Sequence, residues 1–271
     1  MKIEGITISN PGKMLFPEKG ITKGDLVAYY DKIAQYMLPY LKNRPITLQR
    51  FPDGIHKPGF FQKHAQDYFP DYIERIDVKT KDGRAEEILI NNKKSLIYLA
   101  NQSAITFHTW LSSKGSLEFP DKVIFDLDPS DRDFGKLKKS ARLLKKALED
   151  RGIHPSLITS GKKGLHIFYT IRPEKEFDLV RKEALELAES LVKASPGLFT
   201  LEIRKKKRGD RIFLDTLRNG YGQTGVCPFS LRPIESAGVA TPLEWKELGK
   251  ISAGDHYTFN NIFRRLGAMS V

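Results

Sequence analysis

The feature that most constrains the fold of this chain is the stretch Val123–Asp131, which reads VIFDLDPSD. Its apolar start predicts a buried strand, and its end carries two carboxylates, Asp126 and Asp128. Side chains two residues apart on a strand share a face, so these carboxylates would lie side by side while Leu127 points into the core. Two close carboxylates repel, and a divalent cation such as Mg²⁺ or Mn²⁺ is the usual remedy. The alternative is a solvated strand end followed by a Ser-Asp turn.

Charge composition indicates the kind of partner. The chain has 45 Lys and Arg against 33 Asp and Glu, a net charge of +12. This balance favours a polyanion, with nucleic acid as the first candidate, although a merely basic enzyme is the alternative. The single cysteine, Cys227, excludes an intrachain disulfide and fits a reducing cytosol. The sequence shows no signal-peptide core and no apolar run long enough to span a bilayer, so we expect a cytoplasmic, nucleoid-associated protein with no membrane partner.

A second chemical signal is the segment Thr159–Ile167, TSGKKGLHI. A glycine loop between two strands lets backbone N–H groups approach an anion, and its lysines add positive charge. Ser160 can donate a hydroxyl hydrogen bond, and His166 can point back at the loop. These residues would make a triphosphate cradle, although the segment is not a Walker A loop. The alternative is an ordinary hairpin with solvated lysines.

A third signal is the segment Arg211–Asn219, RIFLDTLRN, in which another apolar strand ends in a carboxylate, Asp215. Three residues later, Arg218 could bind a phosphate in bidentate fashion. The alternative is a strand-end Asp paired with a nearby Arg. Read together with Asp126 and Asp128, however, Asp215 would complete a two-metal site for phosphoryl transfer.

Periodicity predicts a mixed architecture. Thr22 and Asp25 have the spacing of a capping pair at the start of a helix over about Lys23–Leu41, and a second long helix is expected from Asp178 to Lys193. Strands and helices alternate without a strict βαβ rhythm, so we predict an α+β (mixed α/β) fold with two subdomains around one active-site cleft. We expect a single catalytic domain over residues 1–271, with DNA contacts in 1–115 and the three motifs in 116–271.

The three motifs VIFDLDPSD, TSGKKGLHI and FLDTLRN resemble those of the archaeo-eukaryotic primase superfamily, in the same order. More narrowly, the chain is similar to the polymerase domain of ligase D, the bacterial end-joining enzyme. The segments NPGKMLFPEKGITKGDLVAYY, GFFQKH, FHTWLS and PFSLRP carry this likeness over nearly the whole chain. The resemblance implies a primase-like catalytic core. Because 271 residues leave no room for a ligase or nuclease module, we expect a stand-alone polymerase.

The resemblance also implies roles in the active site. Two metal ions, Mn²⁺ or Mg²⁺, would be held by Asp126, Asp128 and Asp215. The triphosphate of the incoming nucleotide would be held by Ser160, Lys163, Gly164, His166 and Arg218, with His108 close to its phosphates. Without the resemblance, His108 could equally be a strand histidine with a packing role.

On the DNA side, the resemblance implies that Lys13 and Lys23 grip a 5′-phosphate beyond a gap or break. Phe60 and Phe61 would stack on template bases, which suits any base. We expect Lys63 to add a DNA contact, and Arg208 to help place the template end. Arg208 closes the basic run Arg204-Lys-Lys-Lys-Arg208, whose alternative role is a solvated loop.

The predicted function is a DNA-directed nucleotidyltransferase that fills short gaps and extends broken ends in non-homologous end joining. The resemblance implies a preference for NTPs over dNTPs, and partners that include DNA with 5′-phosphorylated gaps or ends, a separate DNA ligase and a Ku-like end-binding protein.

Two alternatives come from other classes. A haloacid-dehalogenase-like phosphatase also places Asp-x-Asp after an apolar strand, but that motif normally lies near the N-terminus, whereas more than a hundred residues precede Asp126 here. A non-catalytic DNA-end-binding protein would not need the three carboxylates.

Overall fold

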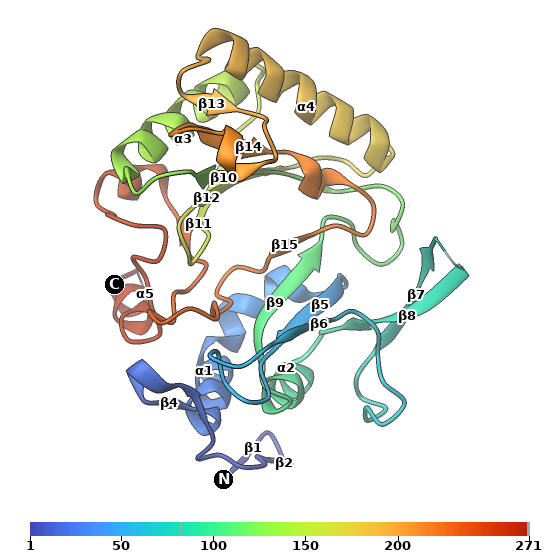
Figure 1. Cartoon of the computed structure of the whole chain (residues 1–271). Helices are drawn as coiled ribbons and strands as arrows, with labels where there is room; N and C mark the ends of the chain where they lie inside the picture. Colours follow the sequence, from blue (N-terminus) through green and yellow to red (C-terminus); the bar gives the residue numbers. More distant parts are fainter. Residues whose placement is uncertain (82, 270–271) are drawn as a thin grey trace.

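Two six-stranded sheets organise the chain and face each other across a central cleft. The computed structural model describes residues 1–81 and 83–269, and it contains helices as well as both sheets (Figure 1). The predicted mixed α/β class is therefore confirmed. Two short hairpins, β1 (Lys2–Ile3) with β2 (Ile6–Thr7) and β3 (Met14–Phe16) with β4 (Ile21–Thr22), precede the first long helix.

The N-terminal sheet has the strand order β15-β9-β5-β8-β7, and β6 pairs with β5 beside that path. Helices α1 and α2 pack against it, and α5 joins the same core from the end of the chain (Figure 1). The β7–β8 hairpin projects from the molecule. The bounds are β5 (Pro45–Arg50), β6 (Phe60–Gln62), β7 (Arg75–Thr80), β8 (Gly83–Leu89), β9 (Ala104–Trp110), β15 (Thr224–Val226), α1 (Lys23–Leu41), α2 (Lys93–Asn101) and α5 (Ile262–Met269).

Helix α1 shows how the sequence sets a boundary. The Thr22 hydroxyl accepts a hydrogen bond from the N–H of Asp25 (3.2 Å), and the Asp25 carboxylate accepts one from the N–H of Thr22 (2.9 Å). This capping box satisfies N–H groups that have no partner within the helix. One stripe of the helix, which includes Leu26, Tyr30 and Ile33, is fully buried in the core. The predicted helix and its cap are confirmed.

The C-terminal sheet has the order β13-β14-β10-β12-β11-β16, in which only the β13–β14 pair is parallel. Helices α3 and α4 cover one face, packing on Leu127, Leu165 and Leu214 (Figure 1). The polar side chains of the same strands therefore face the opposite side, toward the cleft. The bounds are β10 (Lys122–Pro129), β11 (Ser156–Thr159), β12 (Leu165–Thr170), β13 (Phe199–Thr200), β14 (Ile212–Asp215), β16 (Pro242–Leu243), α3 (Phe134–Glu149) and α4 (Phe177–Ala194).

The two sheets are joined by more than one crossing of the chain. After β14, the chain returns to the N-terminal sheet as β15, comes back as β16, and ends in α5 against the N-terminal core. Strands β5 to β9 thus belong to the N-terminal sheet, and strands β10 to β14 and β16 belong to the C-terminal sheet. Strand β15 is the exception, because it follows β14 in the sequence but pairs in the N-terminal sheet. Repeated crossings bring residues far apart in the sequence to the same cleft.

Candidate active site

The three predicted carboxylates lie on one face of the C-terminal sheet. Asp126 of β10 is the direct cross-strand partner of Asp215 on β14 and of His166 on β12. Asp128 follows two residues after Asp126 and shares its face, while Leu127 between them is fully buried in the core. The alternation predicted for VIFDLDPSD is therefore what the structure contains, and antiparallel register brings the third carboxylate beside the first.

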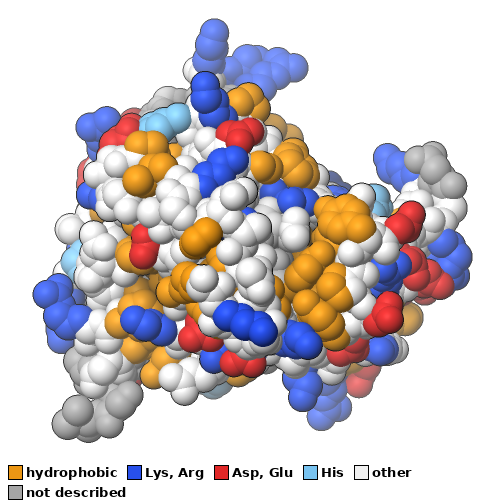
Figure 2. Space-filling model, turned by 90° about the horizontal axis from the view of Figure 1, so that it is seen from below, with side chains coloured by type: hydrophobic (Ala, Val, Ile, Leu, Met, Phe, Trp, Pro, Cys, Tyr) orange, Lys and Arg blue, Asp and Glu red, His pale blue; other side chains and the backbone are white. Residues whose placement is uncertain are grey.

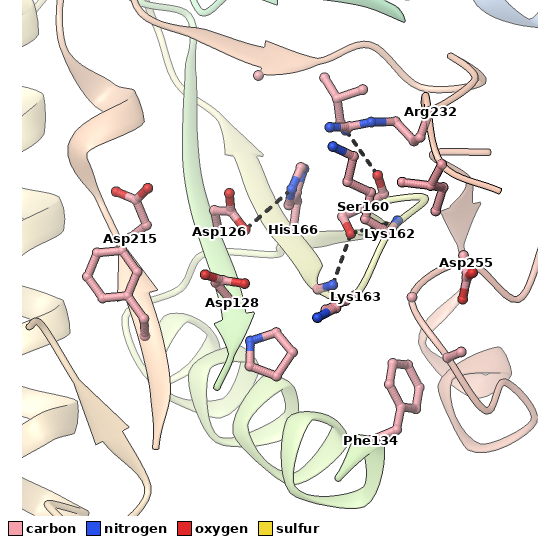
Figure 3. A pocket seen from close by; sticks show the side chains of 18 of the residues that line it. Asp126, Asp128, Phe134, Ser160, Lys162, Lys163, His166, Asp215, Arg232 and Asp255 are labelled. Atoms are coloured by element: carbon pink, nitrogen blue, oxygen red, sulfur yellow. Dashed lines mark hydrogen bonds and ion pairs between the residues drawn. The ribbon is translucent and has the colours of Figure 1, made fainter. Parts of the chain in front are cut away.

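These carboxylates line a cavity of about 1330 Å³ between the two sheets. The cavity gathers ten of the residues named from the sequence: His108, Asp126, Asp128, Ser160, Lys163, Gly164, His166, Arg208, Asp215 and Arg218. Figure 3 shows Asp215 on one side of Asp126 and Asp128, and the Ser160–Lys163 turn on the other. The remaining five, Lys13, Lys23, Phe60, Phe61 and Lys63, do not line this cavity.

Two arginines supply positive charge beside the carboxylates. Nη1 of Arg208 donates to Oδ2 of Asp128 (2.9 Å), and Nε of Arg218 lies 3.9 Å from Asp126 and 3.8 Å from Asp215. Burial nevertheless raises the pKa of Asp215, and the nearby charge of Asp126 raises it further. With the side chains in these positions, no group of three His, Cys, Asp or Glu residues in the described chain is arranged to ligate a metal ion.

Arg208 is held by the chain itself. Its guanidinium also donates to the carbonyls of Glu202 and Ile203 (both 2.8 Å) and stacks on the ring of Phe213, 3.9 Å from its centroid. Residues 204–207 of the basic run are exposed, which is compatible with both a DNA contact and the alternative of a solvated loop, whereas the Arg208 side chain is buried.

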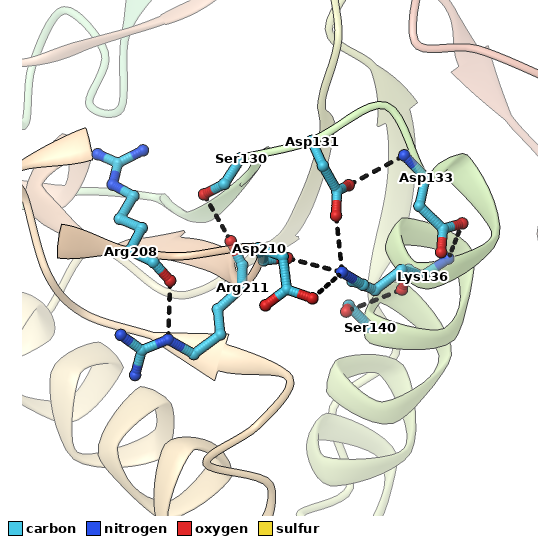
Figure 4. Close-up of polar contacts among 8 residues, drawn as sticks. All are labelled: Ser130, Asp131, Asp133, Lys136, Ser140, Arg208, Asp210 and Arg211. Carbon is cyan, nitrogen blue, oxygen red and sulfur yellow. Dashed lines mark hydrogen bonds and ion pairs between the residues drawn. The ribbon is translucent and has the colours of Figure 1, made fainter. Parts of the chain in front are cut away.

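A polar network that begins at the cavity-lining residue Asp131 connects α3 to the segment around Arg208 (Figure 4). Nζ of Lys136 on α3 bridges the carboxylates of Asp131 (2.7 Å) and Asp210 (2.8 Å), which tether the ends of β10 and β14 to each other. Nε of Arg211 donates to the carbonyl of Arg208 (2.8 Å). These contacts hold in place the loop from which Arg208 donates to Asp128.

The Ser160 turn joins β11 to β12 and is shaped by its serine and glycines. The hydroxyl oxygen of Ser160 accepts from the N–H groups of Lys162 (3.1 Å) and Gly164 (3.0 Å), which leaves its own hydrogen available to donate. Gly161 has φ +67°, and a Cβ at Gly164 would lie 2.5 Å from the carbonyl oxygen of Leu127. Both glycines are therefore required for the turn to pack against the carboxylate strand.

The structure adds two cationic residues that the sequence reasoning missed. Nη1 of Arg232 donates to the carbonyl of Ser160 (3.1 Å), its Nε is buried without a hydrogen-bond partner in the described part of the chain, and burial lowers its pKa to about 10. Burial, followed by the charge of Arg232, lowers the pKa of Lys162 to about 8. Both line the cavity. The signal for Arg232 was present in PFSLRP, a segment we used only for the resemblance.

His108 reaches the cavity from β9 of the N-terminal sheet. Its pKa is lowered well below the usual range, first by burial and then by the charge of Arg232, so the ring is neutral at physiological pH. Its Nε2 is buried and has no hydrogen-bond partner among the residues that the structure describes. A buried polar atom without a partner, in a cavity, is available to a ligand.

Lys13 lies directly before β3, and Lys23 is the first residue of α1. Nζ of Lys13 pairs with Asp53 (2.6 Å), whereas Nζ of Lys23 donates to the hydroxyl of Ser9 (2.7 Å) and forms no ion pair with the described residues. Lys23 is only 6% exposed. Its pKa is lowered by burial and then by the charges of Lys13 and Arg50.

The aromatic pair Phe60 and Phe61 lies on β6, and both rings are exposed. The Arg50 guanidinium sits over the ring of Phe60 at 5.2 Å, and the ring of Phe61 contacts His108 with centroids 6.0 Å apart. Phe61 therefore contacts a residue that lines the cavity, although neither aromatic ring lines it. Lys63 follows them and is exposed.

Seen from below, the N-terminal part shows Lys and Arg side chains spread over the face and around its edge, interleaved with acidic and apolar ones (Figure 2). The net charge of +12 is thus not gathered into one patch on this face.

Comparison with known proteins decides the family. The family model described as LigD, primase-polymerase domain, matches residues 22–270. The chain belongs to this family.

Among curated relatives of this LigD domain, the "Bifunctional non-homologous end joining protein LigD" of Bacillus subtilis is 34% identical over 256 residues, which are 94% of this chain and 41% of the relative. The "Multifunctional non-homologous end joining protein LigD" of Mycolicibacterium smegmatis is 30% identical over 268 residues, 98% of this chain and 35% of the relative. The chain therefore spans about two fifths or less of the length of these relatives.

A solved structure supports the same assignment. The polymerase domain of Mycobacterium tuberculosis ligase D in complex with DNA matches with a TM-score of 0.89 and 28% sequence identity, covering 97% of this chain and 94% of that one. The predicted resemblance and the primase-polymerase fold are confirmed.

As a LigD primase-polymerase domain, the chain is a nucleotidyltransferase of a metal-dependent family, and the predicted enzyme class is confirmed. The phosphatase and the non-catalytic alternatives are set aside by this match. Within residues 1–81 and 83–269, no helix has the length and apolar character needed to cross a bilayer.

Proposed function

We propose that this chain is a template-directed polymerase that fills short gaps and extends broken DNA ends during non-homologous end joining. The observation that carries the proposal is the cross-strand row of Asp215, Asp126 and His166, with Asp128 beside it, facing the Ser160 turn in one cavity. Acidic oxygens next to a cationic, glycine-shaped turn suit the transfer of a nucleotidyl group from a triphosphate.

Asp126, Asp128 and Asp215 would hold two divalent ions, Mn²⁺ or Mg²⁺. Their hard oxygen donors and mutual repulsion fit such ions. The guanidinium groups of Arg208 and Arg218 lie beside these carboxylates and supply positive charge there. Divalent ions held there would lower the pKa of an attacking hydroxyl and neutralise charge on the phosphates.

The chain's own residues would bind and orient the triphosphate. The Ser160 hydroxyl would donate to a phosphate oxygen. Lys163 in the turn and Arg218 beside Asp126 and Asp215 would offer cationic contacts. Gly164 keeps the turn close to β10, while neutral His108 and His166 present ring nitrogens to the phosphates. We add Lys162 and Arg232 to this set, because both line the cavity and neither forms an ion pair with the described residues.

The N-terminal part, residues 1–115, would hold the DNA, and the part from 116 to 271 would carry the chemistry. Lys13 and Lys23 are proposed to grip a 5′-phosphate. The buried ammonium of Lys23 has no carboxylate partner in the described chain and so favours an anion, and Lys13 adds an exposed cation whose present partner is Asp53. Phe60 and Phe61 would stack on template bases, with Lys63 contacting the backbone. Arg208 keeps its proposed role at the template end, although its guanidinium is engaged by Asp128 here.

Three finer features rest on the family alone: a preference for NTPs over dNTPs, cooperation with a separate DNA ligase and a Ku-like end-binding protein, and a cytoplasmic, nucleoid-associated location. The relatives are named as non-homologous end joining proteins, and the solved neighbour is a complex with DNA.

The test is extension of a labelled primer on a gapped template with a 5′-phosphate, in Mn²⁺, with NTPs and dNTPs compared. The Asp126→Ala/Asp128→Ala variant is the control. Extension by the wild type alone supports the polymerase, and the NTP/dNTP ratio gives the sugar preference. Absence of wild-type extension with 5′-phosphate binding retained would overturn the proposal in favour of an end-binding protein.

A further inference from the structure

Two exposed apolar side chains line the cavity, and they follow the neighbouring parallel strands β13 and β14. Ile203 is 61% exposed and Leu217 is 40% exposed, and both line the cavity. Single exposed apolar residues are ordinary on protein surfaces. In the described chain, however, no other exposed large hydrophobic residue lines this cavity. We call Ile203 and Leu217 the apolar lip.

The apolar lip is tied to the carboxylates by backbone hydrogen bonds. The N–H of Leu217 donates to Oδ1 of Asp215 (2.8 Å). The carbonyl of Ile203 accepts from Nη2 of Arg208 (2.8 Å), whose Nη1 donates to Asp128. The two apolar side chains are thus held at a set position relative to the catalytic groups.

Strand order indicates which reactant meets the apolar lip. The Ser160 turn follows β11, on one side of β10, whereas Ile203 and Leu217 follow β13 and β14, on the other side. Figure 3 shows the same separation, with Asp215 and the turn flanking Asp126 and Asp128. In phosphoryl transfer the attacking and leaving oxygens are roughly in line. If the leaving phosphates lie at the turn, the attacking 3′-hydroxyl arrives from the side of the apolar lip.

Positive charge continues from the apolar lip along the same segment. The exposed run 204–207 follows Ile203 directly, and Lys205 lines the cavity. In the part of the chain that the structure describes, the side chains of this run form no ion pairs. A nucleic-acid strand presents the matching chemistry, which is apolar base and sugar faces at its end and phosphates behind them.

We propose that Ile203 and Leu217 hold the last nucleotide of the primer strand, and that the run 204–207 contacts the phosphates preceding it. This inference rests on the proposed polymerase function and assigns one strand to one side of its cavity. Aliphatic side chains contact any base or sugar face, so this contact is independent of sequence.

The first test measures binding of a primer-template with a recessed 3′ end and no downstream strand, by fluorescence anisotropy in EDTA without nucleotide. Ile203→Ser/Leu217→Ser weakens binding about 10-fold, the scale expected for uncovering part of two apolar side chains. The matched control is Leu179→Ser/Leu185→Ser, which alters two exposed leucines on α4 and leaves the affinity unchanged. Equal affinity of the lip variant and the wild type overturns the proposal.

A second readout identifies the strand. The fluorescent base 2-aminopurine is placed either at the primer 3′ end or at the first unpaired template position. The lip variant loses the binding-induced signal change of the primer probe and keeps that of the template probe. A loss confined to the template probe overturns the assignment.

The basic run is tested by the salt dependence of binding. Lys205→Ala/Lys206→Ala/Lys207→Ala lowers the slope of log Kd against log salt by about 0.7 to 0.9 for each phosphate that the run no longer neutralises. Lys139→Ala/Lys182→Ala/Lys193→Ala removes the same charge from α3 and α4 and leaves the slope unchanged. If both triple variants show the same slope, the run 204–207 does not contact the phosphates.

Binding and extension separate the two proposals. A chain that binds the primer end through these residues but extends nothing keeps this inference and overturns the polymerase function. A chain that extends primers while the lip variant binds and reacts like the wild type keeps the polymerase and overturns the apolar lip.

Discussion

The two halves of the molecule differ in how their buried charges are balanced. On the C-terminal sheet, the carboxylates of the cavity have guanidinium groups close by, with Arg208 2.9 Å from Asp128 and Arg218 near Asp126 and Asp215. In the N-terminal part, Lys23 and Glu87 are buried and form no ion pair with any residue the structure describes. Buried charge is costly unless it is paired. We therefore expect a bound anion to balance Lys23, whereas burial favours the protonated form of Glu87.

The largest effect is expected at the carboxylates of the C-terminal sheet. Asp215→Ala removes the carboxylate that joins β14 to the row, and extension falls by at least about 10³-fold, the scale of losing a preorganised electrostatic group. DNA affinity stays within a few-fold of the wild type, because no DNA contact is assigned to the Asp215 side chain. Primer extension and anisotropy measure the two quantities. Asp178→Ala, on the exposed first turn of α4, is the control; full activity of Asp215→Ala would exclude its catalytic role.

The next prediction concerns Glu87, whose pKa is raised to about 7 mainly by burial. The folded state holds this proton more tightly than the unfolded chain, whose ordinary value is 4.5. The free energy of unfolding therefore falls as pH rises from about 4.5 to 7, by up to about 3 kcal/mol. Urea unfolding across this range measures the slope. Lys63 and the bridged residue His64 face the same region, so both stay unchanged in the variants.

Glu87→Gln removes this proton linkage and flattens the stability profile between about pH 4.5 and 7. Glu86→Gln, its exposed neighbour on β8, keeps the wild-type slope. If the slope of Glu87→Gln equals that of Glu86→Gln, the buried carboxyl is not what couples stability to pH.

A smaller effect tests the buried lysine. Lys13→Ala/Lys23→Ala lowers the preference for a 5′-phosphorylated over a 5′-hydroxyl gap by about 10-fold, the scale of hydrogen bonds to a charged group. The ratio of the two dissociation constants gives the preference. Lys2→Ala/Lys19→Ala removes two exposed charges from the same segment and serves as the control. If Lys13→Ala/Lys23→Ala keeps the preference and Lys2→Ala/Lys19→Ala loses it, the 5′-phosphate does not bind at Lys13 and Lys23.

The smallest effect concerns the ion pair of Lys13 with Asp53. This pair is exposed and therefore weak, so Asp53→Asn frees Lys13 and tightens binding of 5′-phosphorylated DNA about 2- to 3-fold. Asp71→Asn, which lies on the surface outside this pair, provides the baseline. Weaker binding by Asp53→Asn would mean that Asp53 positions Lys13 for the phosphate instead of competing with it.

Local rules allowed much of this molecule to be predicted from the sequence. The capping box fixed the start of α1 at Lys23, and the alternation in VIFDLDPSD placed Leu127 in the core and the two carboxylates outside it. The glycine turn after Thr159 was predicted from residue type alone, because its geometry depends on neighbours in the chain. These features need only short-range periodicity and turn chemistry.

What the sequence by itself determined is the chemistry of each motif: three carboxylates at strand ends, a cationic turn and a basic chain. Tertiary structure decided which of them meet. Antiparallel register set Asp215 opposite Asp126, packing buried Arg208 against Asp128, and the return of the chain as β15 brought Arg232 and His108 to one cavity. These contacts join residues about a hundred positions apart, and no local rule fixes such pairings, because they depend on how whole sheets cover their apolar faces.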